Sequence, residues 1–226
     1  MRYYPVFLDI ADKPVVVIGG GTIAEQKIGG LLEAGARVTI VSPDLNEVLT
    51  EHRDAGRLTH IEREYKPGDI EGYELVFVAT DNRAENEKVW AEGRERHIWV
   101  NAVDDVPNCD FIMPGIVRKG DLTLAISTAG KSPAMARKVR EDLETFLSED
   151  DSALLELAAE VRRETRERGI EVEDCPRCQR DHLDVWNAAL DGIVKSLIRE
   201  GRRDEAKSRF LDLLFSPSGQ TVPELS

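Results

Sequence analysis

Three small residues at a fixed spacing are the part of this sequence whose chemistry can be specified most directly. Gly19, Gly21 and Ala24 follow a run of β-branched residues and give the pattern Gly-x-Gly-x-x-Ala. The first glycine allows a tight strand-to-helix turn, the second lets a pyrophosphate approach the backbone, and the alanine lets the helix pack closely on the sheet. The first free N–H groups of that helix would bind the phosphates. The stretch therefore predicts a dinucleotide site that also includes Thr22 and Ile23.

Polar residues after later apolar runs are expected to face the same ligand. Ser42 stands 21 positions after Gly21, where NAD-binding domains often carry an acid for the ribose hydroxyls. Ser42 or Asp44 could bond the ribose instead, and Arg37 lies at the wrong end of its strand to receive a 2′-phosphate, which favours NAD over NADP. The cofactor residues predicted at strand ends are Ser42, Pro43, Thr80 and Asp81. For Thr80 and Asp81, capping of the next helix is an equally good interpretation.

The elements that must position these residues alternate between strand and helix patterns, which is typical of a parallel α/β sheet. A segment over 3–8 carries Pro5 and is expected to be extended, as an added edge strand. The predicted strands cover 15–18, 38–41, 58–64, 75–80 and 98–101, and the predicted helices cover 22–35, 45–55 and 85–96.

The pattern changes at Pro114. Residues 115–127 read as two strands joined at 119–121, and Ser132 followed by Pro133 predicts the start of a helix. A phosphate loop is rejected because Ala125 stands where its first glycine would be. The further predicted helices cover 134–147, 152–168, 185–200 and 204–215. The predicted fold is a Rossmann NAD-binding domain over 1–113, a central dimerisation module over 114–150 and a small helical domain over 151–226.

Composition narrows the class of partner. The chain has 226 residues and a formal net charge of -13, which opposes binding to nucleic acid or anionic lipid. No apolar run is long enough for a membrane helix and no signal peptide is recognised, so we expect a cytoplasmic protein. The loop with Cys175, Cys178 and His182 could bind a metal or act in redox chemistry, but a single Cys-x-x-Cys favours a plain loop, and no metal site is predicted.

Five motifs in the first 147 residues match a known family in both order and spacing. They are Val17–Lys27, Leu31–Ala36, Val100–Asp104, Phe111–Pro114 and Ser127–Ala134. Together they resemble the precorrin-2 dehydrogenase / sirohydrochlorin ferrochelatase family of sirohaem biosynthesis. Because no uroporphyrinogen methyltransferase domain is recognised, the chain resembles the stand-alone form.

The resemblance implies an interlocked homodimer with an N-terminal Rossmann domain, a central dimerisation domain and a helical C-terminal domain. It implies NAD-dependent oxidation of precorrin-2 to sirohydrochlorin, in some members followed by insertion of ferrous iron. The family's functional aspartate corresponds to Asp104, which could take up the proton released in the oxidation; capping of the loop is the structural interpretation, and Asp105 is the neighbouring alternative. The residues implied to bind the tetrapyrrole are Asn101, Thr128, Lys131 and Ser132. Thr128 stands where a serine is common, and Ala129 replaces a glycine.

Two questions stay open at this stage. The substrate is a polycarboxylate, so an acidic protein would need basic residues near its site. Five basic residues could supply that field or could be ordinary surface charges: Arg118, Lys119, Lys131, Arg137 and Lys138. A non-catalytic NAD-sensing regulatory module would also explain the glycine turn, although not the motifs at Phe111–Pro114 and Ser132–Pro133.

Overall fold

The computed structural model describes residues 3–102, 109–168, 190 and 192–215. The chain divides into two compact units, residues 1–113 and 114–226, and each is treated by itself below. The predicted division into three domains stays a prediction. Within the described residues, no helix is both long and apolar enough to cross a membrane.

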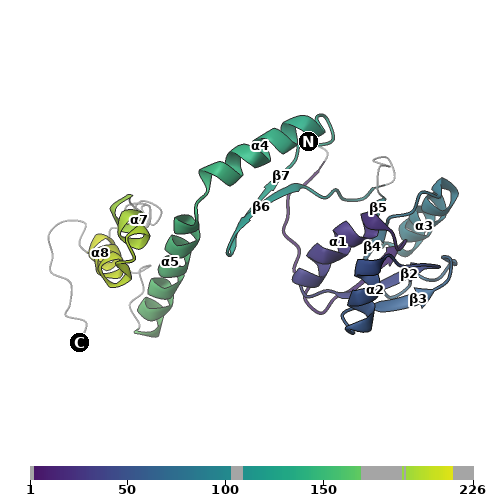
Figure 1. Cartoon of the computed structure of the whole chain (residues 1–226), viewed down its shortest axis with the longest axis horizontal. Coiled ribbons are helices and arrows are strands. Elements are labelled where there is room, and N and C mark those ends of the chain that lie inside the picture. Colours follow the sequence, from purple (N-terminus) through teal and green to yellow (C-terminus); the bar gives the residue numbers. More distant parts are fainter. Residues whose placement is uncertain (1–2, 103–108, 169–189, 191, 216–226) are drawn as a thin grey trace. The chain divides into compact units, whose positions relative to one another are not determined.

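The first unit is built on a parallel sheet of five strands in the order β3-β2-β1-β4-β5 (Figure 1). The strands are β1 Pro14–Ile18, β2 Arg37–Ser42, β3 Thr59–Glu62, β4 Leu75–Val78 and β5 Trp99–Ala102. The helices are α1 Thr22–Glu33, α2 Glu47–Asp54 and α3 Arg83–Arg96. This strand order reverses between β1 and β4, so the carboxyl ends of these two strands mark the ligand crevice of an open α/β sheet.

Both faces of the sheet are covered, which explains why the strands read as continuous apolar runs. Val15 and Val17 of β1 pack with Ile28 of α1 on one face, whereas Val16 and Ile18 pack with Val89 of α3 on the other. This alternation follows from the two-residue period of a strand. These four of the five β1 residues are at most 1% exposed, which places β1 at the centre of the core.

The prediction of an added edge strand at the N-terminus was wrong. Residues 3–8 join neither sheet, and Tyr4, Val6 and Phe7 are all more than half exposed. Pro5 lacks an N–H donor, and the edge strands of the sheet are β3 and β5. The edge of β5 is occupied by Asp110, whose N–H donates to the Val100 carbonyl at 2.9 Å.

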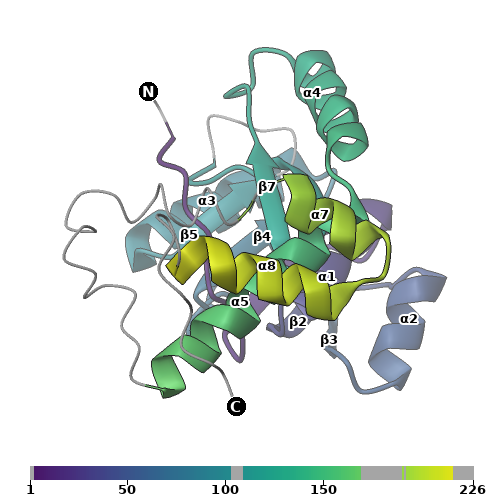
Figure 2. The same cartoon turned by 90° about the vertical axis from the view of Figure 1, so that its left-hand side faces the viewer.

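The second unit begins with the predicted hairpin, β6 Gly115–Lys119 and β7 Leu122–Ile126, which is antiparallel. Gly120 makes the turn with φ +53°. The helices that follow within the described residues are α4 Pro133–Phe146, α5 Glu149–Glu167, α7 Gly192–Arg199 and α8 Arg203–Phe215. Ser132 caps α4 by accepting a hydrogen bond from the Met135 N–H at 3.2 Å, as its sequence predicts. Leu157, Val194 and Phe210 form a common core of α5, α7 and α8, which lie together in Figure 2.

Candidate nucleotide site

The glycine turn between β1 and α1 joins three strand ends. The Gly19 N–H donates to the Val41 carbonyl of β2 at 2.9 Å, and the Ala79 N–H donates to the Ile18 carbonyl at 2.8 Å. Gly19 has φ +114°, and a Cβ on it would lie 2.4 Å from the Ala79 carbonyl oxygen. A side chain is therefore excluded at Gly19 by backbone conformation and by the close approach of the chain after β4.

The next two glycines have opposite surroundings. A Cβ on Gly20 would lie 2.0 Å from the Asp44 carbonyl oxygen, whereas a Cβ on Gly21 would have no neighbour within 4 Å. Gly21 is the N-cap of α1, and among the described residues no side chain caps that helix. The open approach to Gly21 and the uncapped N–H groups after it fit the pyrophosphate of a dinucleotide. Sequence reasoning missed Gly20, although the run of three glycines was the available signal.

The chain after β2 lies against this turn. Ser42 is 7% exposed, and its carbonyl lies 2.9 Å from Nε2 of His60. The Asn46 N–H donates to the Gly20 carbonyl at 2.9 Å, so the loop that holds Pro43 is bonded to the glycine turn. The structure thus brings Ser42 and Pro43 beside the glycines, as the sequence predicts, and their contact with the cofactor stays a prediction.

Thr80 takes part in capping α3. Its hydroxyl accepts a hydrogen bond from the Asn82 N–H at 2.9 Å and lies 3.2 Å from Oδ1 of Asn86. Asp81 is exposed at the same strand end. The structure therefore supplies the capping contacts for Thr80, while the predicted cofactor contacts of both residues remain untested.

One carboxyl group near this strand end is electrostatically unusual. Glu85, in the first turn of α3, has its pKa raised above the ordinary value, first by burial and then by the charge of Glu64. A hydrogen bond from Thr80 acts in the opposite direction. Glu85 therefore holds its proton more readily than an ordinary surface glutamate. The sequence carried no signal for this, because Glu64 stands 21 residues earlier in the chain, before β4.

The end of β5 is fixed by side chains of the returning chain. Asn101 is 6% exposed, and its Nδ2 donates to the Phe111 carbonyl at 2.9 Å. The thiol of Cys109 donates to the Ala102 carbonyl at 2.9 Å and accepts from the Ala102 N–H at 3.2 Å. Asn101 thus has a structural bond, and its predicted substrate contact remains untested. Asp104 and Asp105 lie outside the described residues.

The other predicted substrate residues belong to the second unit and make local bonds. The Thr128 hydroxyl donates to the Ser132 carbonyl at 3.1 Å and accepts from the Ser132 N–H at 3.3 Å. Lys131, between them, is exposed. Ala129 has φ +53°, the left-handed conformation that favours the glycine it replaces. This turn is therefore held by a threonine hydroxyl and carries local backbone strain.

Acidic partners are described for Lys119, Arg137 and Lys138, which are among the basic residues proposed to attract a polycarboxylate. Lys119 binds Glu149 at 2.9 Å, and two pairs on α4 join residues four apart, Arg137 with Glu141 and Lys138 with Asp142. These contacts favour the interpretation as ordinary surface charges for Lys119, Arg137 and Lys138.

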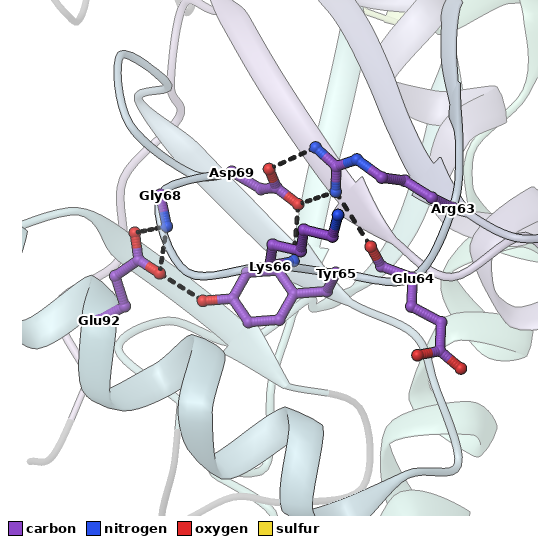
Figure 3. Close-up of polar contacts among 7 residues, drawn as sticks. All are labelled: Arg63, Glu64, Tyr65, Lys66, Gly68, Asp69 and Glu92. Carbon is purple, nitrogen blue, oxygen red and sulfur yellow. Dashed lines mark hydrogen bonds and ion pairs between the residues drawn. The ribbon is translucent and has the colours of Figure 1, made fainter.

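A second polar cluster holds the chain between β3 and β4 (Figure 3). Arg63 donates two hydrogen bonds to Asp69, at 2.6 and 2.8 Å, and Glu92 of α3 accepts from the Gly68 N–H and the Tyr65 hydroxyl. Burial, and then Glu92, raise the pKa of Tyr65, and the hydrogen bond from Arg63 lowers that of Asp69. Because the cluster supports a long loop, we assign it a structural role.

No group of three or more metal-binding side chains occurs within the described part of the chain. The loop with Cys175, Cys178 and His182 lies outside that part.

Comparison with known proteins agrees with this architecture. Residues 6–115 match the family described as "Putative NAD(P)-binding", and residues 119–145 match the sirohaem biosynthesis protein central family. The first match confirms the predicted cofactor as a dinucleotide of the NAD(P) type, which is what its description names. Relatives include the siroheme synthase of Methylococcus capsulatus, 35% identical over 99% of this chain, and siroheme synthase 1 of Pectobacterium atrosepticum, 36% identical over 96%.

The chain spans just under half the length of these relatives, 46% and 44%. Among solved structures, it resembles SirC, a precorrin-2 dehydrogenase, with a TM-score of 0.71 over 92% of this chain and 98% of that one. At 24% identity this likeness establishes the fold. With two adjacent family matches and relatives aligned along almost its whole length, the chain is similar to proteins of sirohaem biosynthesis.

Proposed function

We propose that the chain oxidises precorrin-2 to sirohydrochlorin with NAD. The observation that carries the proposal is the pairing, in one chain, of an NAD(P)-binding unit with a sirohaem biosynthesis central region. The siroheme synthase relatives and the SirC fold likeness support the same reaction. Because the chain spans just under half of those relatives, their activity is transferred to it here as a proposal.

The proposed reaction removes a hydride and a proton from the macrocycle. Bound NAD would supply the hydride acceptor. The glycine turn and the first N–H groups of α1 bind the pyrophosphate, and Ser42 with the following loop lies at the ribose. Asp104, which follows β5 in the sequence, accepts the proton in this proposal, because its carboxylate is the simplest base that the family motif provides. The protein's remaining task is to hold the macrocycle against the cofactor.

The proposal includes a second reaction on the tetrapyrrole, which is metal insertion. Ferrous iron is a substrate if the chain also inserts metal into sirohydrochlorin, and Asp104 would then take up pyrrole protons. We place the protein in the cytoplasm, in keeping with three cysteines, too few for a disulfide framework.

We further propose a homodimer built on residues 114–150. None of the α4 side chains is buried, and Met135 and Phe146 are 56% and 78% exposed. A hairpin and one helix expose more apolar surface than they can bury alone. Light scattering at micromolar concentration should give twice the mass of one chain, and a monomeric mass would contradict this part of the proposal.

Incubation of the protein with precorrin-2 and NAD tests the activity. We expect NADH and sirohydrochlorin to appear together, followed as absorbance, and added ferrous iron reports the second step. The matched control is Gly21→Asp, which places a carboxylate in the open approach to the pyrophosphate. Folded protein that binds NAD but gives no turnover with fresh precorrin-2 would contradict the proposal and favour the NAD-sensing alternative.

A further inference from the structure

The end of β2 lacks the carboxylate that commonly binds the adenosine ribose, and the structure shows what lies there instead. Ser42 is buried, and its Oγ lies 2.9 Å from the position of a Cβ on Gly20, so it faces the glycine turn. Asp44, two residues later, is exposed, and its backbone carbonyl packs over Gly20. The acid that selects NAD in many Rossmann domains is therefore absent from its usual position.

Asn46 joins the three elements around this corner. Its N–H donates to the Gly20 carbonyl at 2.9 Å, and its Oδ1 caps α2 by accepting from the Leu49 N–H at 3.0 Å. Its Nδ2 donates to Oε2 of Glu25 in α1 at 2.6 Å. Because the cap requires the oxygen of the amide at Leu49, the NH₂ group must face Glu25.

Glu25 is thus held in the first turn of α1 by a neutral amide partner. Asp44 and Glu47 add two further acids in the loop and helix that Asn46 anchors. A ribose 2′-hydroxyl can donate to such a carboxylate, whereas a 2′-phosphate would be repelled by it.

From these contacts we infer that Glu25, oriented by Asn46, selects NAD over NADP. Glu25, a residue of α1, takes the role of the acid that is missing at the end of β2. The inference rests on the proposed nucleotide site and assigns its specificity to a residue outside the glycine pattern. Asn46 is a positioning residue, since it acts on the nucleotide through Glu25.

Binding, measured by calorimetric titration with NAD and with NADP, tests the inference without the enzyme reaction. We expect the wild-type protein to prefer NAD. Glu25→Gln should shift the NADP to NAD affinity ratio about tenfold toward NADP, and Glu25→Arg about a hundredfold, because a charge first disappears and then reverses. Asn46→Ser, which keeps a helix-capping oxygen but loses the NH₂ donor, should shift the ratio in the same direction by a smaller factor.

Two control variants complete the experiment. Glu33→Gln removes the same charge from the far end of α1, about 12 Å along the helix, and should leave the ratio unchanged. Asp44→Asn tests the other acid at this corner. If Asp44→Asn moves the ratio and Glu25→Gln does not, or if neither Glu25 variant moves it while NAD still binds, the inference is overturned. Failure of the wild-type protein to bind NAD would contradict the proposed cofactor site itself.

Discussion

The carboxylate of Asp110 accepts a hydrogen bond from the Val100 N–H at 2.9 Å, and the Asp110 N–H donates to the Val100 carbonyl at the same distance. Val100 lies in the edge strand β5 and is fully buried. One residue thus satisfies both backbone groups that a neighbouring strand would otherwise pair. Asp110 therefore closes the edge of the sheet at Val100.

Asp110→Ala should destabilise the first unit by about 1–3 kcal/mol, because the buried Val100 N–H loses its acceptor. Asp110→Asn keeps an oxygen at the same place and should lose much less. Urea unfolding followed by tryptophan fluorescence measures the difference. Equal losses in the two variants would show that the carboxylate charge, and not the hydrogen bond, stabilises this edge.

The glycines of the turn should separate folding from nucleotide binding. Gly20→Ala places a Cβ 2.0 Å from the Asp44 carbonyl oxygen, so it should lower the melting temperature and weaken NAD binding together. The Cβ of Gly21→Asp meets no protein atom within 4 Å, so this variant should melt like the parent and still lose NAD binding by charge and bulk. Thermal melts and NAD titrations on both variants check this. Undiminished NAD affinity in folded Gly21→Asp would remove the assignment of the pyrophosphate site.

The sequence predicted the strands and helices only as far as local patterns reach. The run from Val15 to Ile18 is apolar throughout because both faces of β1 are covered, and that pattern can be read directly. The pairing of Asn46 with Glu25 could not be read, because it joins residues 21 apart whose side chains meet only after β2 pairs with β1. The bonds of Asp110 could not be read for the same reason, since they depend on where the chain turns after β5.

The cluster at Asp69 should make stability depend on pH in the acid range. Its hydrogen bonds from Arg63 lower the pKa of Asp69 in the folded protein below its unfolded value of about 3.9. A depressed carboxyl pKa contributes stability that is complete above the unfolded value and lost as pH falls through the folded value. Asp69→Asn should therefore destabilise the protein at pH 7 and progressively less below about pH 4. Unfolding midpoints between pH 2 and 7 test this, and a constant difference would contradict it.

Replacement of Ala129 by glycine should increase the stability of the second unit. Its φ of +53° is a left-handed conformation that costs an ordinary residue about 1–2 kcal/mol, whereas glycine adopts it without a steric penalty. The greater freedom of glycine in the unfolded chain offsets part of this gain. We expect Ala129→Gly to raise the stability of the second unit by a few tenths to about 1 kcal/mol. Thermal melting compared with Ala125→Gly, where β7 is regular, checks this; equal effects would show that Ala129 carries no strain.

The last prediction separates the catalytic role of Asp104 from a structural one. The residue follows β5, whose end is fixed by the bond from Asn101 to the Phe111 carbonyl and by the two bonds between Cys109 and Ala102. These bonds do not involve Asp104, so Asp104→Ala should leave the melting temperature and NAD affinity close to those of the parent. Loss of a general base should lower the rate of precorrin-2 oxidation about 10²–10⁴-fold.

Asp105→Ala is the matched control, since it removes the neighbouring carboxylate. It should keep most of the rate, and the same comparison applies to iron insertion if that step occurs. Loss of a loop cap would instead cost about 0.5–2 kcal/mol of stability with little change in rate. If Asp104→Ala melts earlier and turns over at the parent rate while Asp105→Ala is slow, the proton acceptor is Asp105, and Asp104 is a structural residue of the loop.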